Sequence, residues 1–121
     1  MLVLILLITQ IEIKQDIQIN ELNISLLENE YYKDLNISDV SKVTITKYTE
    51  GGSDIEEIED KDEILKIYNY LKKQTLIEET NMACEDNTVI YIFVTNDDKE
   101  YKVEKECDWF VINNKRYLYK K

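Results

Sequence analysis

The fold of this chain is decided by the stretch "VSKVTITKYTEGGSDIEEIEDKDEILKIYNYL", residues 40–71. In its first part Val43 and Ile45 alternate with threonines, which is typical of a strand with one buried face. The two glycines at 51–52 predict a tight turn. Residues 55–58 then predict a short return strand. The stretch therefore begins with a β-hairpin whose second arm is strongly acidic.

A helix is predicted over residues 60–73. Apolar side chains recur there at the spacing of one helix face: Ile64, Ile67, Tyr68 and Leu71. Asp60 is placed to cap the first turn, and Glu63 stands at the capping-box position. Because one stripe is apolar and the rest is polar, we expect this helix to lie with one face on a sheet.

Residues 88–121 predict three further strands. The segment "TVIYIFVT" (88–95) is apolar on both faces, so we expect a central strand covered on both sides. A turn at 96–99 leads into a return strand at 100–113, and residues 115–121 predict a last edge strand whose lysines discourage further pairing. The predicted fold class is α+β, with a twisted antiparallel sheet of about five strands and one principal helix (60–73) packed on one face.

The N-terminal region has a different character. Residues 1–15 open with the apolar run "MLVLILLI", which is shorter than the roughly 20 residues that span a bilayer. We interpret them either as the remnant of an export signal or membrane anchor, or as a first strand. Residues 16–39 are interpreted as a poorly defined linker, and residues 40–121 as the α+β domain. A short helix inside the linker would follow from the four-residue spacing of Leu27, Tyr31 and Leu35.

Composition restricts the chemistry that this chain can perform. It has no histidine and a single arginine, Arg116. Without an imidazole there is no Ser-His or Cys-His nucleophile pair and no histidine metal ligand. A glycine-rich phosphate loop is also missing, because the glycines at 51–52 lack the following Lys-Ser/Thr. We therefore expect a protein that is not an enzyme and that uses no cofactor or metal ion.

The charge is −10 and is concentrated in one region. Residues 50–63 hold eight acids against Lys61 alone, and such a surface repels nucleic acid. Two interpretations stay open for this run. It is either a solvated strand edge and helix start, or an acidic binding face for a protein with a basic surface. The residues of that face would be Glu56, Glu57, Glu59 and Asp62.

Aromatic residues offer a second candidate surface. The chain has nine tyrosines and one tryptophan. Such rings either fill the core and the strand surfaces or, where they are exposed together, form an interface. The exposed patch predicted on the second interpretation consists of Tyr91, Phe93 and Trp109.

The two cysteines, Cys84 and Cys107, bracket the predicted hairpin. If the hairpin loop has two residues, Cys107 lies opposite Thr88, and a straight strand would hold the sulfurs about 13 Å apart. Residues 83–87 contain no strand former, so the chain can bend there and bring the cysteines together. We expect a disulfide if the protein is exported and free thiols if it is cytoplasmic.

Residues 40–121 resemble small extracytoplasmic α+β domains of low-GC Gram-positive bacteria. The resemblance rests on three segments: "VTITKY", "IEEIEDKDEILKIYNYL" and "WFVINNKRYLY". It implies a location outside the cytoplasm and an α+β fold, and it implies no activity, because none is established for that group. The chain departs from the group at Asn114, where a glycine is common, and it lacks a lipobox cysteine.

Three functional hypotheses follow, and the least favoured, a hydrolase that uses surface carboxylates, would need a deep cleft that holds two acids within reach of one substrate. The first is a non-enzymatic module, secreted or tethered to the membrane through its N-terminus, that binds a basic protein with its acidic face. The alternative is a cytoplasmic immunity-type or antitoxin-like protein that occludes a basic toxin. Free cysteines, and residues 1–8 packed into the sheet, would favour the alternative.

Overall fold

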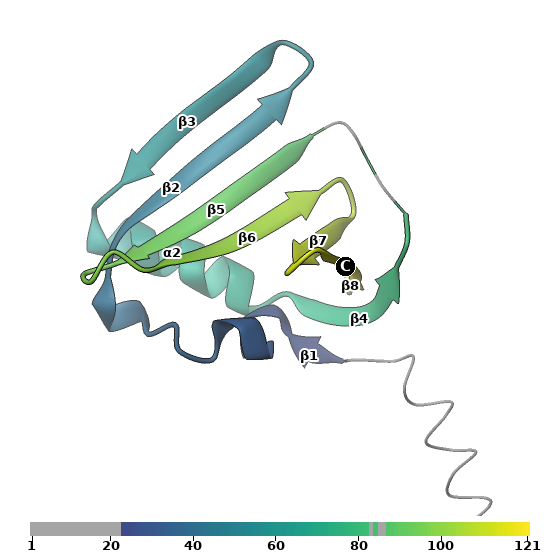
Figure 1. Cartoon of the computed structure of the whole chain (residues 1–121), viewed down its shortest axis with the longest axis horizontal. Helices are drawn as coiled ribbons and strands as arrows, with labels where there is room; N and C mark the ends of the chain where they lie inside the picture. Colours follow the sequence, from purple (N-terminus) through teal and green to yellow (C-terminus); the bar gives the residue numbers. More distant parts are fainter. Residues whose placement is uncertain (1–22, 83, 85–86) are drawn as a thin grey trace, which may run out of the picture.

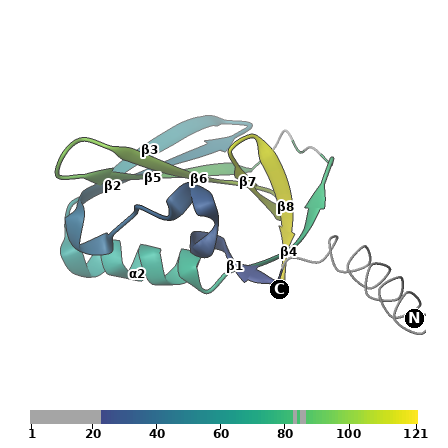
Figure 2. The same ribbon diagram turned by 60° about the horizontal axis from the view of Figure 1, so that its bottom comes forward.

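The computed structural model describes residues 23–82, 84 and 87–121. Within them, the helix α2 (Lys61–Lys72) lies across one face of an open antiparallel sheet (Figures 1 and 2). The α+β class is thereby confirmed, but the sheet has eight strands instead of about five. In sequence these are β1 (Ile24–Ser25), β2 (Val40–Thr49), β3 (Gly52–Ile58), β4 (Thr75–Thr80), β5 (Thr88–Thr95), β6 (Glu100–Glu106), β7 (Trp109–Ile112) and β8 (Lys115–Tyr119).

Three short 3-10 helices precede β2 and lie on the same side of the sheet as α2 (Figure 2). They are η1 (Leu26–Glu28), η2 (Glu30–Tyr32) and η3 (Ile37–Asp39). Leu26 is fully buried, and the buried Tyr32 donates a hydrogen bond from its hydroxyl to the carbonyl oxygen of Lys102 at 2.7 Å. The described part of the predicted linker therefore belongs to the folded unit, whereas the predictions for residues 1–22 lie outside the described residues.

The helix begins where the sequence predicts. The Asp60 carboxylate accepts a hydrogen bond from the backbone N–H of Asp62 at 3.0 Å, which satisfies a free amide of the first turn. Glu63 does not complete the predicted capping box, because its carboxylate pairs with Lys66 at 3.3 Å. Ile64 and Leu71 are buried against the sheet, as the apolar stripe predicts.

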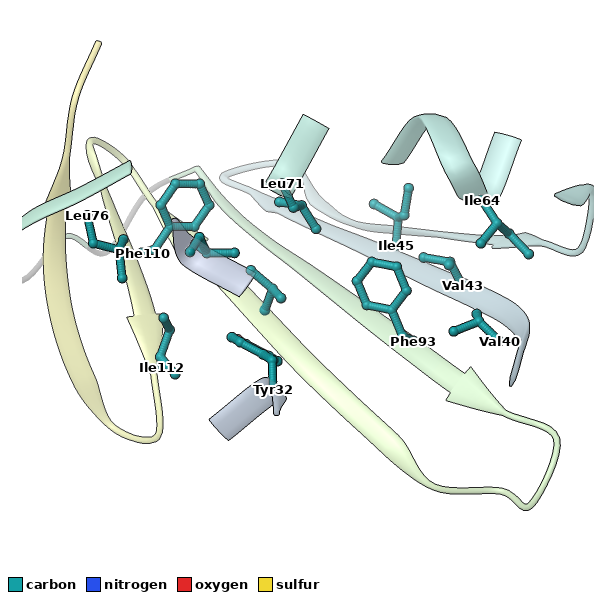
Figure 3. Packing of buried hydrophobic residues seen from close by; sticks show 12 residues of the cluster. Tyr32, Val40, Val43, Ile45, Ile64, Leu71, Leu76, Phe93, Phe110 and Ile112 are labelled. Atoms are coloured by element: carbon teal, nitrogen blue, oxygen red, sulfur yellow. The ribbon is translucent and has the colours of Figure 1, made fainter. Parts of the chain in front are cut away.

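The core lies between α2, the 3-10 segment and one face of the sheet (Figure 3). Val43 on β2 is paired with Phe93 on β5, and Phe93 meets the ring of Tyr68 edge-on, with centroids 6.3 Å apart. A bulge between Val40 and Lys42 adds one residue to β2, so both Val40 and Val43 reach the core despite their odd spacing. The predicted cover on both faces of β5 is not present: the described helices all lie on one side (Figure 2).

The β5–β6 hairpin differs from the predicted register by one residue. The backbone N–H of Thr95 donates to the carbonyl oxygen of Lys99 at 2.9 Å, so the loop has three residues. Asp98 takes φ +61°, the left-handed conformation that such loops need and that Asp tolerates. As a consequence Thr88 lies opposite Glu106, and Cys107 falls beyond the paired region.

The predicted return strand at 100–113 is two strands, β6 and β7. A tight turn at Cys107 and Asp108 separates them, with Cys107 at φ +45°. Trp109 therefore folds back to pair with Glu106. The next turn, at Asn113-Asn114, was predicted from the tolerance of asparagine for positive φ, and both residues have it, at +50° and +65°.

The edges of the sheet are not where the sequence places them. In space the strands run β1-β4-β8-β7-β6-β5-β2-β3. The predicted edge strand at 115–121 corresponds to β8, which lies between β4 and β7 and is no edge. Beyond β8 lie β4, an unpredicted strand after the helix, and then the two-residue β1, which ends the sheet on that side among the described residues. At the other end the sheet finishes with the acidic strand β3.

Candidate functional site

The predicted acidic residues lie together at one end of the sheet, along β3 and the start of α2. We call Glu56, Glu57, Glu59 and Asp62 the acidic edge. All four are exposed. Glu56 and Glu57 belong to β3, Glu59 follows it, and Asp62 is in the first turn of α2, where a carboxylate is favourable beside the positive end of the helix dipole. In Figure 1, β3 is the outermost strand at this end of the sheet, and the end of β3 leads directly into the start of α2.

Little positive charge offsets the acidic edge. Glu57 pairs with Lys42 at 3.6 Å, and both side chains are partly in solvent. In the described part of the chain the other three residues of the acidic edge make no ion pair within 4.0 Å. An exposed pair contributes at most about 1 kcal/mol to stability. The acidic edge is therefore an exposed negative surface, and ion pairing of its charges contributes little to the stability of the fold.

The aromatic patch predicted from Tyr91, Phe93 and Trp109 does not exist as a surface. Phe93 is 0% and Trp109 6% exposed. Burial also raises the pKa of Tyr91 above its ordinary value, with smaller contributions from neighbouring charges. The alternation of the strand puts Tyr91 and Phe93 toward α2, whereas Trp109 lies on the opposite face after the turn at Cys107. Phe93 and Trp109 are therefore packing residues, although the sequence alone was compatible with either packing or an exposed interface.

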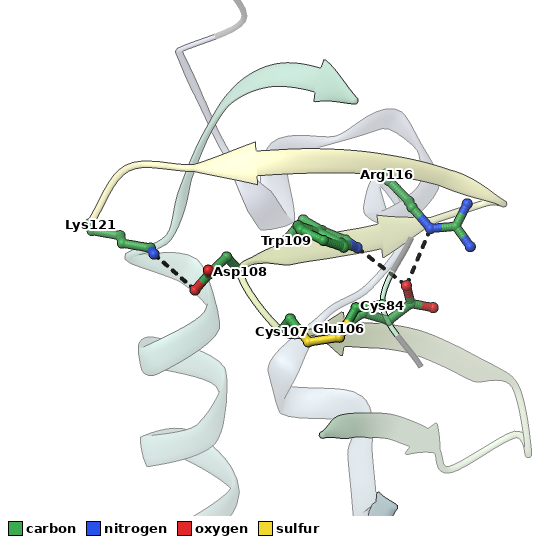
Figure 4. Close-up of a disulfide and its surroundings, with 7 residues drawn as sticks. All are labelled: Cys84, Glu106, Cys107, Asp108, Trp109, Arg116 and Lys121. Carbon is green, nitrogen blue, oxygen red and sulfur yellow. Dashed lines mark hydrogen bonds and ion pairs between the residues drawn. A yellow bond between two sulfur atoms is a disulfide. The ribbon is translucent and has the colours of Figure 1, made fainter. Parts of the chain in front are cut away.

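The two cysteines form a disulfide in the structure (Figure 4). Their Cα atoms are 6.2 Å apart, inside the range of about 4.4–6.8 Å for such bonds. Cys84 comes from the connection between β4 and β5, and Cys107 from the turn between β6 and β7. The disulfide therefore joins two connections at one end of the β5–β6 hairpin. A disulfide is consistent with an oxidising compartment.

A polar cluster beside the disulfide was not predicted (Figure 4). The carboxylate of Glu106 accepts hydrogen bonds from the Trp109 indole nitrogen and from Arg116 Nε, each at 3.2 Å. The side chain of Glu106 is only 13% exposed, so this ion pair is better shielded from solvent than the Lys42–Glu57 pair at the acidic edge. No sequence motif links the three residues, since the strand register alone brings them together. Arg116, the sole arginine of the chain, therefore forms an ion pair between two strands of the sheet.

A second ion pair connects the C-terminal residue to the turn at Cys107 and Asp108. Lys121 Nζ lies 2.8 Å from the Asp108 carboxylate. This hydrogen bond and the lysine charge lower the pKa of Asp108, and the hydrogen bond to Asp108 likewise raises the pKa of Lys121. Both side chains are exposed to solvent, so we interpret the pair as a contact that holds the chain end and not as a reactive site.

A hollow of about 490 Å³ is lined by the η1–η2 segment and the β7–β8 hairpin. It is open and mixed in character, because its lining includes acids, lysines and apolar side chains: Glu28, Glu30, Tyr31, Lys33, Ile112 and Lys115. Its lining contains no serine, threonine or cysteine that could act as a nucleophile. Within residues 23–82, 84 and 87–121 no three Cys, Asp or Glu side chains are grouped to hold a metal ion.

Comparison with known proteins does not assign this chain to a family. No family model, no curated protein and no solved structure matches it. The resemblance to extracytoplasmic domains therefore stays a prediction. Of the described helices, none has both the length and the apolar character needed to cross a membrane.

Proposed function

We propose that this protein is a non-enzymatic binding module, secreted or membrane-tethered, whose acidic edge contacts a basic surface of another protein. One observation carries this proposal: four exposed carboxylates lie together on an outer strand and the adjoining helix start, with a single ion pair among them. A negative patch that is not used by the fold attracts a basic partner and speeds its association. The absence of histidine from the sequence supports a binding role over a catalytic one.

The proposed location rests on the disulfide. Paired cysteines persist outside the cytoplasm and are rare within it. The cytoplasmic immunity-type alternative shares the acidic edge, but it was expected to have free cysteines, and Cys84 and Cys107 are paired. No specific observation on the described residues favours that alternative, so we do not propose it.

Charge reversal tests the binding role. A lysine-rich peptide is titrated into the full chain and into Glu56→Lys/Glu59→Lys, with Glu28→Lys/Glu30→Lys as a control. The control changes the charge equally but on the η1–η2 segment, where both acids are also exposed. We expect binding that weakens with salt, is lost in the first variant and is kept in the control. Equal losses in both variants would mean general attraction to a −10 chain and would refute a specific acidic face.

Fractionation tests the location. In its native host, the protein should be recovered outside the cytoplasm, and a thiol reagent should label neither cysteine before reduction. Recovery in the cytoplasm with both thiols reactive would refute export.

A further inference from the structure

The outer side of β3 is an open sheet edge. In the part of the chain that the structure describes, β3 pairs only with β2 and ends the strand order. Alternate residues of such a strand direct their N–H and C=O groups away from the sheet, where the backbone of another strand can form hydrogen bonds with them. Its first six residues are all exposed.

This edge lacks most features by which proteins block strand addition. Pairing with β2 runs through seven consecutive residue pairs, from Gly52–Thr49 to Ile58–Val43, without a bulge. β3 contains neither proline nor lysine. Protection by a bulge, a proline or an outward lysine is therefore missing, and only acidic side chains guard the edge. A long, regular edge of this kind suits an incoming strand of the right charge.

The strand register shows which side chains would meet that strand. Glu56 pairs with Ile45 of the core, so Asp54 and Glu56 belong to the helix-covered face of the sheet. Ile55 pairs with Thr46 and lies, with Glu57, on the open face. Ile55 is 69% exposed, unusually so for an isoleucine in mid-strand. An added strand would bring an apolar neighbour to Ile55 and cations to the acids beside it.

A second copy of this chain fits the edge poorly. Antiparallel pairing of two β3 strands about Ile55 would set Asp54 of one copy opposite Glu56 of the other, twice. Like charges directly opposite one another destabilise a strand pair. The same acids favour a strand with lysine or arginine at alternate positions, and charge complementarity therefore selects a basic partner over self-association.

We propose that the outer edge of β3 binds an extended basic segment of a partner protein as a ninth strand of the sheet. This inference rests on the proposed function and specifies its mode. Main-chain hydrogen bonds to β3 supply affinity, and alternate basic side chains beside Asp54 and Glu56 supply selectivity. The partner segment would carry a β-branched or aromatic residue next to Ile55.

Two peptides test this mode against simple charge attraction. The first is an eight-residue peptide of alternating lysine and valine. The second has the same side chains, but its backbone nitrogens are methylated, so it keeps its charge and donates no ladder hydrogen bonds. Both are titrated into the full-length protein by fluorescence anisotropy, and hydrogen exchange of the β3 amides is followed with and without the first peptide.

Strand addition predicts that methylation weakens binding about tenfold or more and that amides of β3 gain protection when the first peptide binds. The variant Asp54→Lys/Glu56→Lys should lose about tenfold or more in affinity, because two attractive cross-strand pairs become repulsive. Glu28→Lys/Glu30→Lys should bind as the wild type does. The comparison of the two peptides uses wild-type protein, so it distinguishes strand addition from charge attraction even if the charge-reversed variant folds poorly.

The contrary outcomes separate the two proposals. If both peptides bind equally and only Asp54→Lys/Glu56→Lys loses them, strand addition is overturned while an acidic binding face stands. If neither peptide binds, or both variants weaken binding alike, the binding face is overturned too. Dimers of the unliganded protein with protected β3 amides would identify a second copy as the occupant and would also overturn the basic-segment assignment.

Discussion

Removing the disulfide by the double substitution Cys84→Ser/Cys107→Ser should destabilise the protein substantially. The cysteines are 23 residues apart, so their bond closes a loop of about 24 residues in the unfolded chain. The chain-entropy relation for such a loop gives about 3 kcal/mol of stabilisation, because the cross-link removes conformations only from the unfolded state. For a domain of this size, we expect the Tm to fall by about 12 °C.

Urea denaturation followed by far-UV circular dichroism measures this effect. With a slope of about 1.5 kcal/mol per molar urea, the midpoint should fall by about 2 M. The slope itself should rise slightly, since an unfolded chain without the cross-link exposes more surface. Wild-type protein treated with a reductant should match the double variant, and the double variant should not respond to the reductant.

The reasoning is refuted if the double variant and the oxidised wild type unfold at the same urea concentration. It is refuted equally if reductant leaves the wild-type midpoint in place. Either result would mean that Cys84 and Cys107 do not restrain the unfolded chain, and the main support for an extracytoplasmic location would be lost with it.

Three further perturbations test the packing and one turn. Tyr32→Phe should cost about 1–2 kcal/mol in urea denaturation, because it deprives the Lys102 carbonyl of a buried partner at 2.7 Å. Phe93→Ala should cost more, about 3–5 kcal/mol in the same assay, since it empties the centre of the core. Asp97→Asn should make stability less dependent on acid pH. The Thr95 hydroxyl lowers the pKa of Asp97 below its ordinary 3.8, so the ionised carboxylate stabilises the folded state. The stability difference from wild type should be present at neutral pH and disappear as the pH falls through the folded-state pKa. A difference that persists in strong acid would contradict this assignment.

Local sequence signals were sufficient for the elements nearest to each other in the chain. The β2–β3 hairpin and α2 were predictable because Gly52 permits the turn, Asp60 caps the helix, and one apolar stripe fixes its face. Residues 23–39 were not predictable in this way. The four-residue spacing of Leu27, Tyr31 and Leu35 predicts one short helix, but the chain forms separate 3-10 turns there. Leu26 and Tyr32 are buried against distant parts of the chain, and the Tyr32 hydroxyl donates to the Lys102 carbonyl.

Two errors in the second half, in the β5–β6 register and in the return strand, share one cause, which is the left-handed conformation of a single residue. Asp98 at φ +61° lengthens one loop and shifts the hairpin register by one residue. Cys107 at φ +45° splits a predicted strand into two and sends Trp109 to the other face. Aspartate tolerates this conformation, but residue type alone does not show which aspartate of the turn at 96–99 adopts it, and cysteine is not a residue that favours it.

The candidate site was predictable to the extent that it depends on charge. Acids in an edge strand and a first helical turn stay in solvent whatever the details of packing, and the acidic edge is exposed. Aromatic residues carry no such information, because burial and interface formation favour the same side chains. The cluster of Glu106, Trp109 and Arg116 depends on register between β6, β7 and β8, which became known only with the fold.

The distribution of acids also disfavours pairing between the open sheet edges of two copies of this chain. At the end opposite β3, the short β1 pairs only with Thr75 and Leu76, which leaves the rest of β4 open on that side among the described residues. That open part carries Glu78 and Glu79, both exposed. Contact between β3 of one copy and β4 of another would therefore bring acids together, and so would contact between two β3 strands. Charge of one sign at both ends of the sheet opposes edge-to-edge association, and the same charge is the reason why we propose a basic strand as the occupant of the β3 edge.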